Sequence, residues 1–290
     1  MLDWQISLAK AFEPVHPAAI SIRNFRTMNM KSKLLSPLAS LALAAVCHAE
    51  IKHETVGYQQ GPTTLEGYLA WDDSTTAPRP GVLVVHNWMG LTKDTQEIAD
   101  RLAKLGYVAF AADIYGKGVR PANQQEAGVQ AGKYKADRPL LRQRIEAALT
   151  ELRQQKTVDQ SKIAAIGYCF GGTTVLELAR DGAEIAGVVS FHGGLDSPTP
   201  ADGKNIKAKL LILHGANDPT NSPENVAAFQ DELRQAHVDW QMIYYGNAVH
   251  AFTDKSAGND PTKPVAYDAK ADRRSWQAMK DFFAEIFGTP

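Results

Sequence analysis

Short apolar runs alternate with amphipathic segments along most of this chain. The apolar runs have the length of buried strands, and the amphipathic segments repeat their apolar residues every three or four positions, as helices do. The predicted strands are residues 52–58, 64–70, 81–85, 107–112, 163–168, 185–191, 209–214 and 240–245. The predicted helices are residues 95–105, 139–155, 172–180, 223–236 and 272–287. This alternation predicts one α/β domain with a mostly parallel central sheet that is flanked by helices.

The connections add two expectations to this pattern. The first two predicted strands follow each other closely, and we expect them to form an antiparallel pair. Two long stretches, residues 114–138 and 253–270, are interpreted as loops, and each follows the end of a predicted strand. Loops at strand ends often carry binding groups. Both stretches are therefore expected to wall a pocket, with simple connecting loops as the alternative.

Residues 167–172, which read GYCFGG, join a predicted strand to the helix that follows it. A G-x-nucleophile-x-G sequence between a strand and a helix is the elbow that exposes a nucleophile above the sheet. The glycines leave room for a tight turn and for close packing of the helix on the strand. Here the nucleophile position holds Cys169, at a helix N-terminus, a place that favours the thiolate. A buried structural cysteine is the alternative.

Two further residues complete the order of a catalytic triad. Asp218 lies in the loop after the strand 209–214, and His250 lies in the loop after the next strand. The order of nucleophile, acid and histidine is that of the α/β-hydrolases. Taken singly, Asp218 also suits a turn and His250 a solvated loop. Together with Cys169 they predict a Cys-His-Asp triad on an α/β-hydrolase fold.

These segments make the chain resemble the dienelactone hydrolase family. The similarity covers about residues 52–288 and includes the stretches 84–91 and 107–115. The resemblance implies a carboxylic ester hydrolase that acts on small esters or lactones without a cofactor. The developing oxyanion needs two backbone donors. The elbow predicts the amide of Phe170 as one donor, and the resemblance implies the amide of Trp88 as the other.

Four residues near these segments are predicted to bind substrate: Asn87, Met89, His192 and Phe252. Two positions depart from the pattern of the family. Asn87 replaces a glutamate that partners the resting thiol, and Asp254 replaces an arginine that anchors the substrate carboxylate. Because an acidic side chain repels a carboxylate, we expect neutral esters or lactones to be preferred over anionic ones.

Composition and spacing exclude several other classes. The chain has 31 basic and 32 acidic residues without a basic run or a repeat, which argues against a nucleic-acid partner. His86, His192 and His214 follow strand ends, but their spacing matches no metal-ligand motif. A redox-responsive or ligand-binding protein with Cys169 as its sensor, and a thioesterase, stay open as alternatives. The chain is expected to be a monomer or a homodimer.

Residues 28–49 show the three parts of a secretory signal peptide. A short basic segment precedes an apolar run at 34–46, and small residues at 47 and 49 suit a cleavage site after Ala49. The apolar run is too short to span a bilayer comfortably. An uncleaved amphipathic arm is the alternative.

This interpretation divides the chain into three parts. Residues 1–27 show no targeting pattern and are interpreted as an upstream extension from a misassigned start codon. Residues 28–49 are the signal peptide, and residues 50–290 are the hydrolase domain. The mature protein is expected in the periplasm or outside the cell, without a membrane anchor. Cleavage also removes Cys47, so that Cys169 is the one cysteine of the mature domain.

Overall fold

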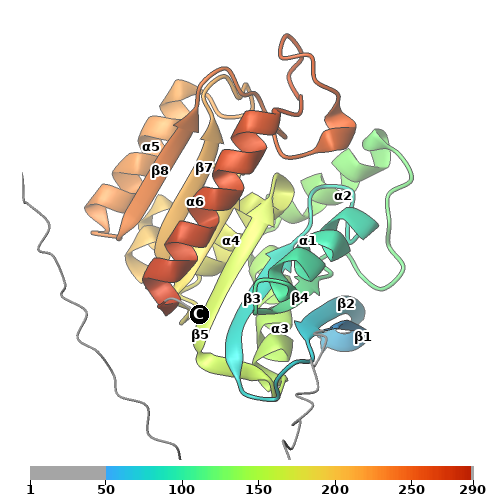
Figure 1. Ribbon diagram of the computed structural model, residues 1–290. Coiled ribbons are helices and arrows are strands. Elements are labelled where there is room, and N and C mark those ends of the chain that lie inside the picture. Colours follow the sequence, from blue (N-terminus) through green and yellow to red (C-terminus); the bar gives the residue numbers. More distant parts are fainter. Residues whose placement is uncertain (1–49, 289–290) are drawn as a thin grey trace, which may run out of the picture. The chain divides into compact units, whose positions relative to one another are not determined.

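A computed structural model describes residues 50–288, and these contain one eight-stranded sheet (Figure 1). The predicted extension and signal peptide lie outside the described residues. The strands are β1 (Ile51–Gln60), β2 (Thr63–Asp72), β3 (Arg79–Val85), β4 (Val108–Ala112), β5 (Val158–Tyr168), β6 (Gly187–Phe191), β7 (Lys209–Gly215) and β8 (Trp240–Tyr245). Their order in the sheet is β1-β2-β4-β3-β5-β6-β7-β8. The first two strands are antiparallel, as expected, and β3 to β8 run parallel.

Helices cover both faces of this sheet. They are α1 (Lys93–Ala103), α2 (Gln124–Ala136), α3 (Arg138–Gln154), α4 (Phe170–Arg180), α5 (Pro223–Gln235) and α6 (Ala269–Phe287). The apolar faces of α3, α4 and α5 belong to one core cluster, and those of α1 and α6 belong to the other. The predicted α/β-hydrolase arrangement of a mostly parallel sheet between two helical layers is therefore confirmed.

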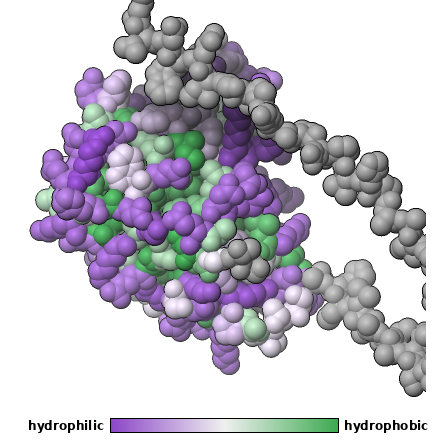
Figure 2. All heavy atoms as spheres, turned by 60° about the vertical axis from the view of Figure 1, so that its left-hand side comes forward, coloured by the Kyte–Doolittle hydropathy of each residue, from purple (hydrophilic) through white to green (hydrophobic). Residues whose placement is uncertain are grey.

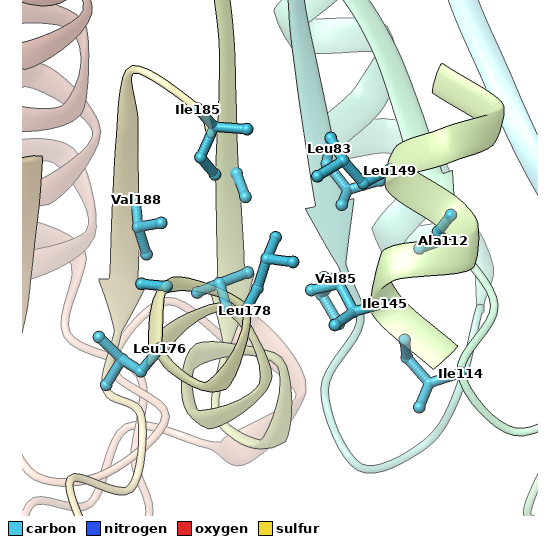
Figure 3. Close-up of a cluster of buried hydrophobic side chains, with 14 of the residues drawn as sticks. Leu83, Val85, Ala112, Ile114, Ile145, Leu149, Leu176, Leu178, Ile185 and Val188 are labelled. Carbon is cyan, nitrogen blue, oxygen red and sulfur yellow. The ribbon is translucent and has the colours of Figure 1, made fainter. Parts of the chain in front are cut away.

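The central strands are apolar along their whole length because each of their faces meets a helical layer. In β3, Leu83 and Val85 point to the face of α3, while Val82 and Val84 point to the opposite face. Figure 3 shows Leu83 and Val85 beside Ile145 and Leu149 of α3, and Leu176 and Leu178 of α4 nearby. These side chains form a continuous core under the carboxyl ends of the strands.

The loop prediction for residues 114–138 is wrong, because α2 lies inside that stretch. Asn123 caps this helix, and its side chain accepts a hydrogen bond from the amide of Glu126 at 2.9 Å. The carboxylate of Glu126 in turn accepts from the amide of Ala122, so the helix start has a reciprocal cap. The helix buries only three side chains and contains two glycines, which explains its weak periodicity in the sequence.

The start of α6 also differs from the prediction. The helix begins at Ala269 rather than at Asp272, because the side chain of Asp268 accepts from the amides of Lys270 and Ala271. Strand β6 is shorter than predicted and begins at Gly187.

The two edges of the sheet are β1 and β8. Half-buried apolar residues lie along β8, and its Tyr244 is 47% exposed. Figure 2 shows the side of the molecule toward α5, β8 and α6, where polar and apolar surface alternate.

No helix among residues 50–288 has the length and apolar character needed to cross a membrane.

Candidate active site

The elbow places Cys169 between β5 and α4 in a strained backbone conformation. Its φ is 53° and its ψ is −112°, a region that residues with a side chain seldom adopt. Two glycines make this turn possible by their lack of a side chain. A Cβ on Gly167 would lie 2.0 Å from the carbonyl oxygen of Gly171, and a Cβ on Gly171 would lie 2.3 Å from that of Val85. Strain of this kind is typical of functional sites.

The three predicted triad residues meet at the carboxyl ends of β5, β7 and β8. The Nε2 atom of His250 lies 3.0 Å from the sulfur of Cys169. The Nδ1 atom of His250 lies 2.9 Å from Oδ2 of Asp218. The other carboxylate oxygen of Asp218 accepts hydrogen bonds from the amide and the hydroxyl of Thr220, at 2.8 and 2.6 Å. The carboxylate is thus held in place for the histidine.

Burial and hydrogen bonding set the charges of this group. Burial alone would lower the pKa of His250, but its hydrogen bonds with Asp218 and Cys169 outweigh that effect and raise the pKa to about 10. Burial would raise the pKa of Asp218, yet the hydrogen bonds from His250 and Thr220 leave it below its ordinary value. The site therefore favours a charged imidazolium between a carboxylate and the sulfur.

The two predicted oxyanion donors lie at the ends of neighbouring strands, because β3 pairs with β5 up to Val85 and Gly167. Phe170 is the first residue of α4, where an amide has no acceptor inside the helix. The Trp88 carbonyl accepts from the hydroxyl of Tyr115 at 2.9 Å, which fixes the loop after β3. The Phe170 amide thus belongs to the elbow itself and Trp88 to the loop after the neighbouring strand, and their joint action as oxyanion donors stays a prediction.

The side chain of Asn87 has a contact within its own loop, and its predicted contact with substrate stays a prediction. Its Oδ1 atom accepts from the amide of Met89 at 2.9 Å, so the amide group stabilises the loop itself. The preceding His86 has a similar role. Its Nδ1 lies 2.6 Å from the Asn87 carbonyl, and its Nε2 accepts from the amide of Ile114. Burial lowers the pKa of His86 to about 4, so the ring is neutral.

Two other predicted substrate-binding residues, His192 and Phe252, are buried close to His250. Phe252 is fully buried, and its ring meets the ring of His192 edge to face at 5.0 Å. His192 is 2% exposed, and both of its ring nitrogens have protein partners. A direct substrate contact by either residue stays a prediction. Met89 is half-buried in the loop after β3, and its contact with substrate stays a prediction.

Two further polar residues near these loops have structural contacts. Asp113 is buried and accepts from the amides of Tyr115 and Gly116, so it fixes the loop that leaves β4. Asp254 accepts from the amide and the hydroxyl of Ser256 within its own loop. Among the described residues, no group of three histidine, cysteine or acidic side chains is arranged to hold a metal ion.

Three sets of contacts at the site were not predicted from the sequence. They are the hydrogen bonds of Thr220 with Asp218, of Tyr115 with the Trp88 carbonyl, and of His192 with Cys169 and Thr253. A hydroxyl residue two positions after Asp218 is a frequent turn partner, so Thr220 had a recognisable signal.

A surface hollow of about 380 Å³ lies along residues 119–130, and none of the triad residues lines it. This hollow does not belong to the triad.

Comparisons with known proteins show what this chain is similar to. The family model described as "Dienelactone hydrolase family" matches residues 65–287. An uncharacterized protein of Caenorhabditis elegans is 38% identical over 154 residues, which cover 51% of this chain and 94% of that protein. A putative carboxymethylenebutenolidase of Yersinia pestis is 29% identical over 263 residues, which cover 84% of this chain and 95% of that protein.

A solved structure gives a similar result. The dienelactone hydrolase-like promiscuous phosphotriesterase P91, from metagenomic libraries, is 43% identical to this chain. The match covers 81% of this chain and 98% of P91, with a TM-score of 0.77.

Proposed function

Because the chain belongs to the dienelactone hydrolase family, we propose that it hydrolyses small carboxylic esters or lactones with a Cys169-His250-Asp218 triad. One observation carries the proposal. The sulfur, the two ring nitrogens and the carboxylate form a continuous chain with steps of 3.0 and 2.9 Å. Such a chain activates a nucleophile and orients its acid–base partner.

The proposed reaction proceeds through a thioester. The Cys169 thiolate attacks the carbonyl carbon, and the carbonyl oxygen takes up the negative charge beside the amides of Phe170 and Trp88. The carbon–oxygen bond to the leaving group then breaks, and His250 gives its proton to the leaving alcohol. The neutral imidazole next takes a proton from water, which attacks the thioester. Collapse of this second intermediate releases the acid and the thiolate, and His250 keeps the proton.

The test compares substrate classes and single substitutions. A panel of lactones, 4-nitrophenyl esters and acyl thioesters is assayed with wild type, Cys169→Ala and Asp218→Asn. We expect turnover of esters and lactones, none above background for Cys169→Ala, and a fall of roughly 10⁴-fold in kcat for Asp218→Asn. Thioesters as the preferred class would favour a thioesterase. Oxidation of Cys169 without turnover of any substrate would favour a sensor and contradict the proposal.

Substrate charge is the next part of the proposal. Asp254 stands where the family resemblance implies an arginine, and its carboxylate adds negative charge to the loop after β8. We therefore expect a higher kcat/KM for a neutral lactone than for its carboxylated counterpart. Asp254→Arg should narrow that difference. A wild-type preference for the anionic lactone would contradict this part of the proposal.

A second activity has one supporting observation, which is the 43% identity to a promiscuous phosphotriesterase. An aryl phosphotriester presents a polarised P=O group and a good leaving group to the same nucleophile and donors. We propose slow hydrolysis of such a triester at the same triad. The assay adds the triester to the panel above, and activity that persists in Cys169→Ala would contradict a shared site.

We also propose that residues 28–49 direct secretion and are removed. The support is the three-part sequence pattern alone. Expression in a bacterial host, followed by intact-mass measurement of the periplasmic fraction, should give a chain that begins near Glu50. A soluble cytoplasmic product that retains residues 28–49 would contradict this proposal.

A further inference from the structure

His192 lies where three strand ends meet, and its backbone is strained. It follows the last residue of β6, its φ is 39°, and its amide donates to the carbonyl of Leu213 in β7 at 2.8 Å. Five non-glycine residues among those described have a positive φ. Three of them are Cys169, His192 and Ala251, the residue after His250. Strain in the described chain is thus concentrated around the triad, which points to a functional constraint.

The left-handed turn directs the ring of His192 toward the nucleophile. The amide of Cys169 donates both to the carbonyl of Phe191 at 3.0 Å and to Nδ1 of His192 at 3.1 Å. Because an amide can only donate, Nδ1 has to accept. A neutral ring then carries its proton on Nε2. The ring therefore supports the strained elbow residue directly.

The other ring nitrogen reaches the loop of the catalytic histidine. Nε2 of His192 lies 2.8 Å from the hydroxyl oxygen of Thr253, three residues after His250. With its proton on Nε2, His192 donates to that oxygen. One ring thus connects the segment of the nucleophile to the segment of the proton carrier.

Packing keeps this ring neutral and close to His250. The two imidazole rings meet edge to face with centroids 5.2 Å apart, and Phe252 covers another side. Burial, and then the charge on His250, hold the pKa of His192 well below its ordinary value. A second proton would also set an N–H against the amide of Cys169. The neutral ring is thus the form that the geometry accepts.

We propose that His192 is a positioning residue that ties the Cys169 elbow to the His250 loop through its two ring nitrogens. The inference rests on the proposed hydrolytic function of the triad. The hydrogen bonds of His192 go to the Cys169 backbone and the Thr253 side chain, not to the sulfur. Its loss should therefore misplace the sulfur relative to Nε2 of His250 and change the chemical step more than substrate binding.

Three substitutions separate the two hydrogen bonds. His192→Leu removes both hydrogen bonds. His192→Asn keeps an acceptor for the amide of Cys169, and His192→Gln keeps a donor for the hydroxyl of Thr253. His214→Leu is the matched control, because His214 is also buried at a neighbouring strand end. Among the described residues, its Nδ1 has no hydrogen-bond partner. Each variant is assayed for kcat and KM on 4-nitrophenyl acetate, and for alkylation of Cys169 by iodoacetamide.

We expect His192→Leu to lower kcat roughly 100-fold with KM changed less than about threefold, since small misplacements cost that much. The alkylation of Cys169 should slow, because the imidazolium no longer sits against the sulfur. His192→Asn should recover part of kcat, and His214→Leu should keep kcat within about threefold of wild type. Circular dichroism and the melting temperature establish that each variant is folded.

A folded His192→Leu with kcat and alkylation within about threefold of wild type would overturn the inference. An equal loss in His214→Leu would do the same, since it would indicate a general packing effect. If His192→Leu does not fold, Thr253→Val removes only the distant bond, with Thr253→Ser as its rescue. In that case equal kcat in Thr253→Val and wild type overturns the inference. Absence of turnover in wild type would refute the proposed function instead, while the alkylation rates still test the position of Cys169.

Discussion

At the scale of single residues, the charge of His250 decides what the site does near neutral pH. The ordinary pKa of a histidine is about 6.5. In the structure burial opposes the charged ring, but Asp218 on one side and Cys169 on the other raise the pKa to about 10. The ring is therefore an imidazolium at neutral pH and holds the proton that the leaving group needs. His250 and Cys169 thus form a hydrogen-bonded pair, in which Nε2 of the imidazolium lies 3.0 Å from the sulfur.

The first prediction concerns this pair. Cys169→Ala removes the hydrogen bond and the electrostatic interaction between His250 and the sulfur, so the pKa of His250 should fall below its wild-type value of about 10. NMR titration of the ring protons measures both values. Because of its raised pKa, His250 contributes to the stability of the folded state. This contribution is fully present below a pH of about 6.5 and is lost as the pH rises through about 10. The same loss of the proton should reduce kcat/KM in that range. An unchanged or higher pKa of His250 in Cys169→Ala would contradict the pair.

At the scale of elements, the elbow depends on how closely α4 approaches β3. The first turn of α4 lies against the carbonyl groups of Val85 and His86, which a Cβ on Gly171 would meet at 2.3 and 2.6 Å. Backbone oxygens cannot move aside as side chains do. The approach of α4 and the position of the Phe170 amide thus require a glycine at this position.

The second prediction follows from this contact. Gly171→Ala should destabilise the fold by about 1–3 kcal/mol or more and lower kcat, because the helix start has to shift. Gly128→Ala in α2 is the matched control, since a Cβ there meets nothing within 4 Å. This control should be stabilised by about 0.5–1 kcal/mol. Urea unfolding measures both, and equal effects of the two substitutions would argue against the steric account.

Sequence patterns predicted the strands and most helices because these bury continuous or periodic apolar residues. Helix α2 was not predicted because only Ala127, Ala131 and Tyr134 are buried. This apolar face is too narrow to give a helical period in the sequence. The proximity of Cys169, His250 and Asp218 was predictable because the three residues follow strand ends in a known order. The bridge made by His192 was not, because it depends on a left-handed backbone turn and on the ring's tautomer, and neither leaves a pattern in the sequence.

At the scale of the whole domain, a buried ionic cluster joins the helices on one face of the sheet. Arg180 of α4 is fully buried and contacts both carboxylate oxygens of Glu232 in α5 at 2.8 Å. It also contacts Glu177, which in turn pairs with Arg138 and Arg142 of α3. Burying these charges is costly unless each keeps its partner. The cluster therefore makes the relative placement of α3, α4 and α5 sensitive to single changes.

The third prediction tests that sensitivity. Glu232→Gln keeps the shape of the side chain but removes the charge that compensates Arg180, and it should destabilise the domain by about 3–5 kcal/mol. Glu184→Gln is the control, because Glu184 pairs with Lys207 on the surface. That exposed pair should contribute about 0–1 kcal/mol. Thermal unfolding followed by circular dichroism compares the two, and a similar small effect for both would contradict the account of the cluster.

The central claim is that Cys169 forms a covalent thioester during ester hydrolysis. The most direct measurement is mass spectrometry of the protein, quenched in acid during turnover of 4-nitrophenyl acetate, followed by peptide mapping. We expect one acetyl group on the peptide that contains Cys169 in the wild type. We expect none on that peptide in Cys169→Ala, which should also lack turnover. An acetyl group on another residue that turns over at the rate of catalysis, or wild-type turnover by folded Cys169→Ala, would contradict the account.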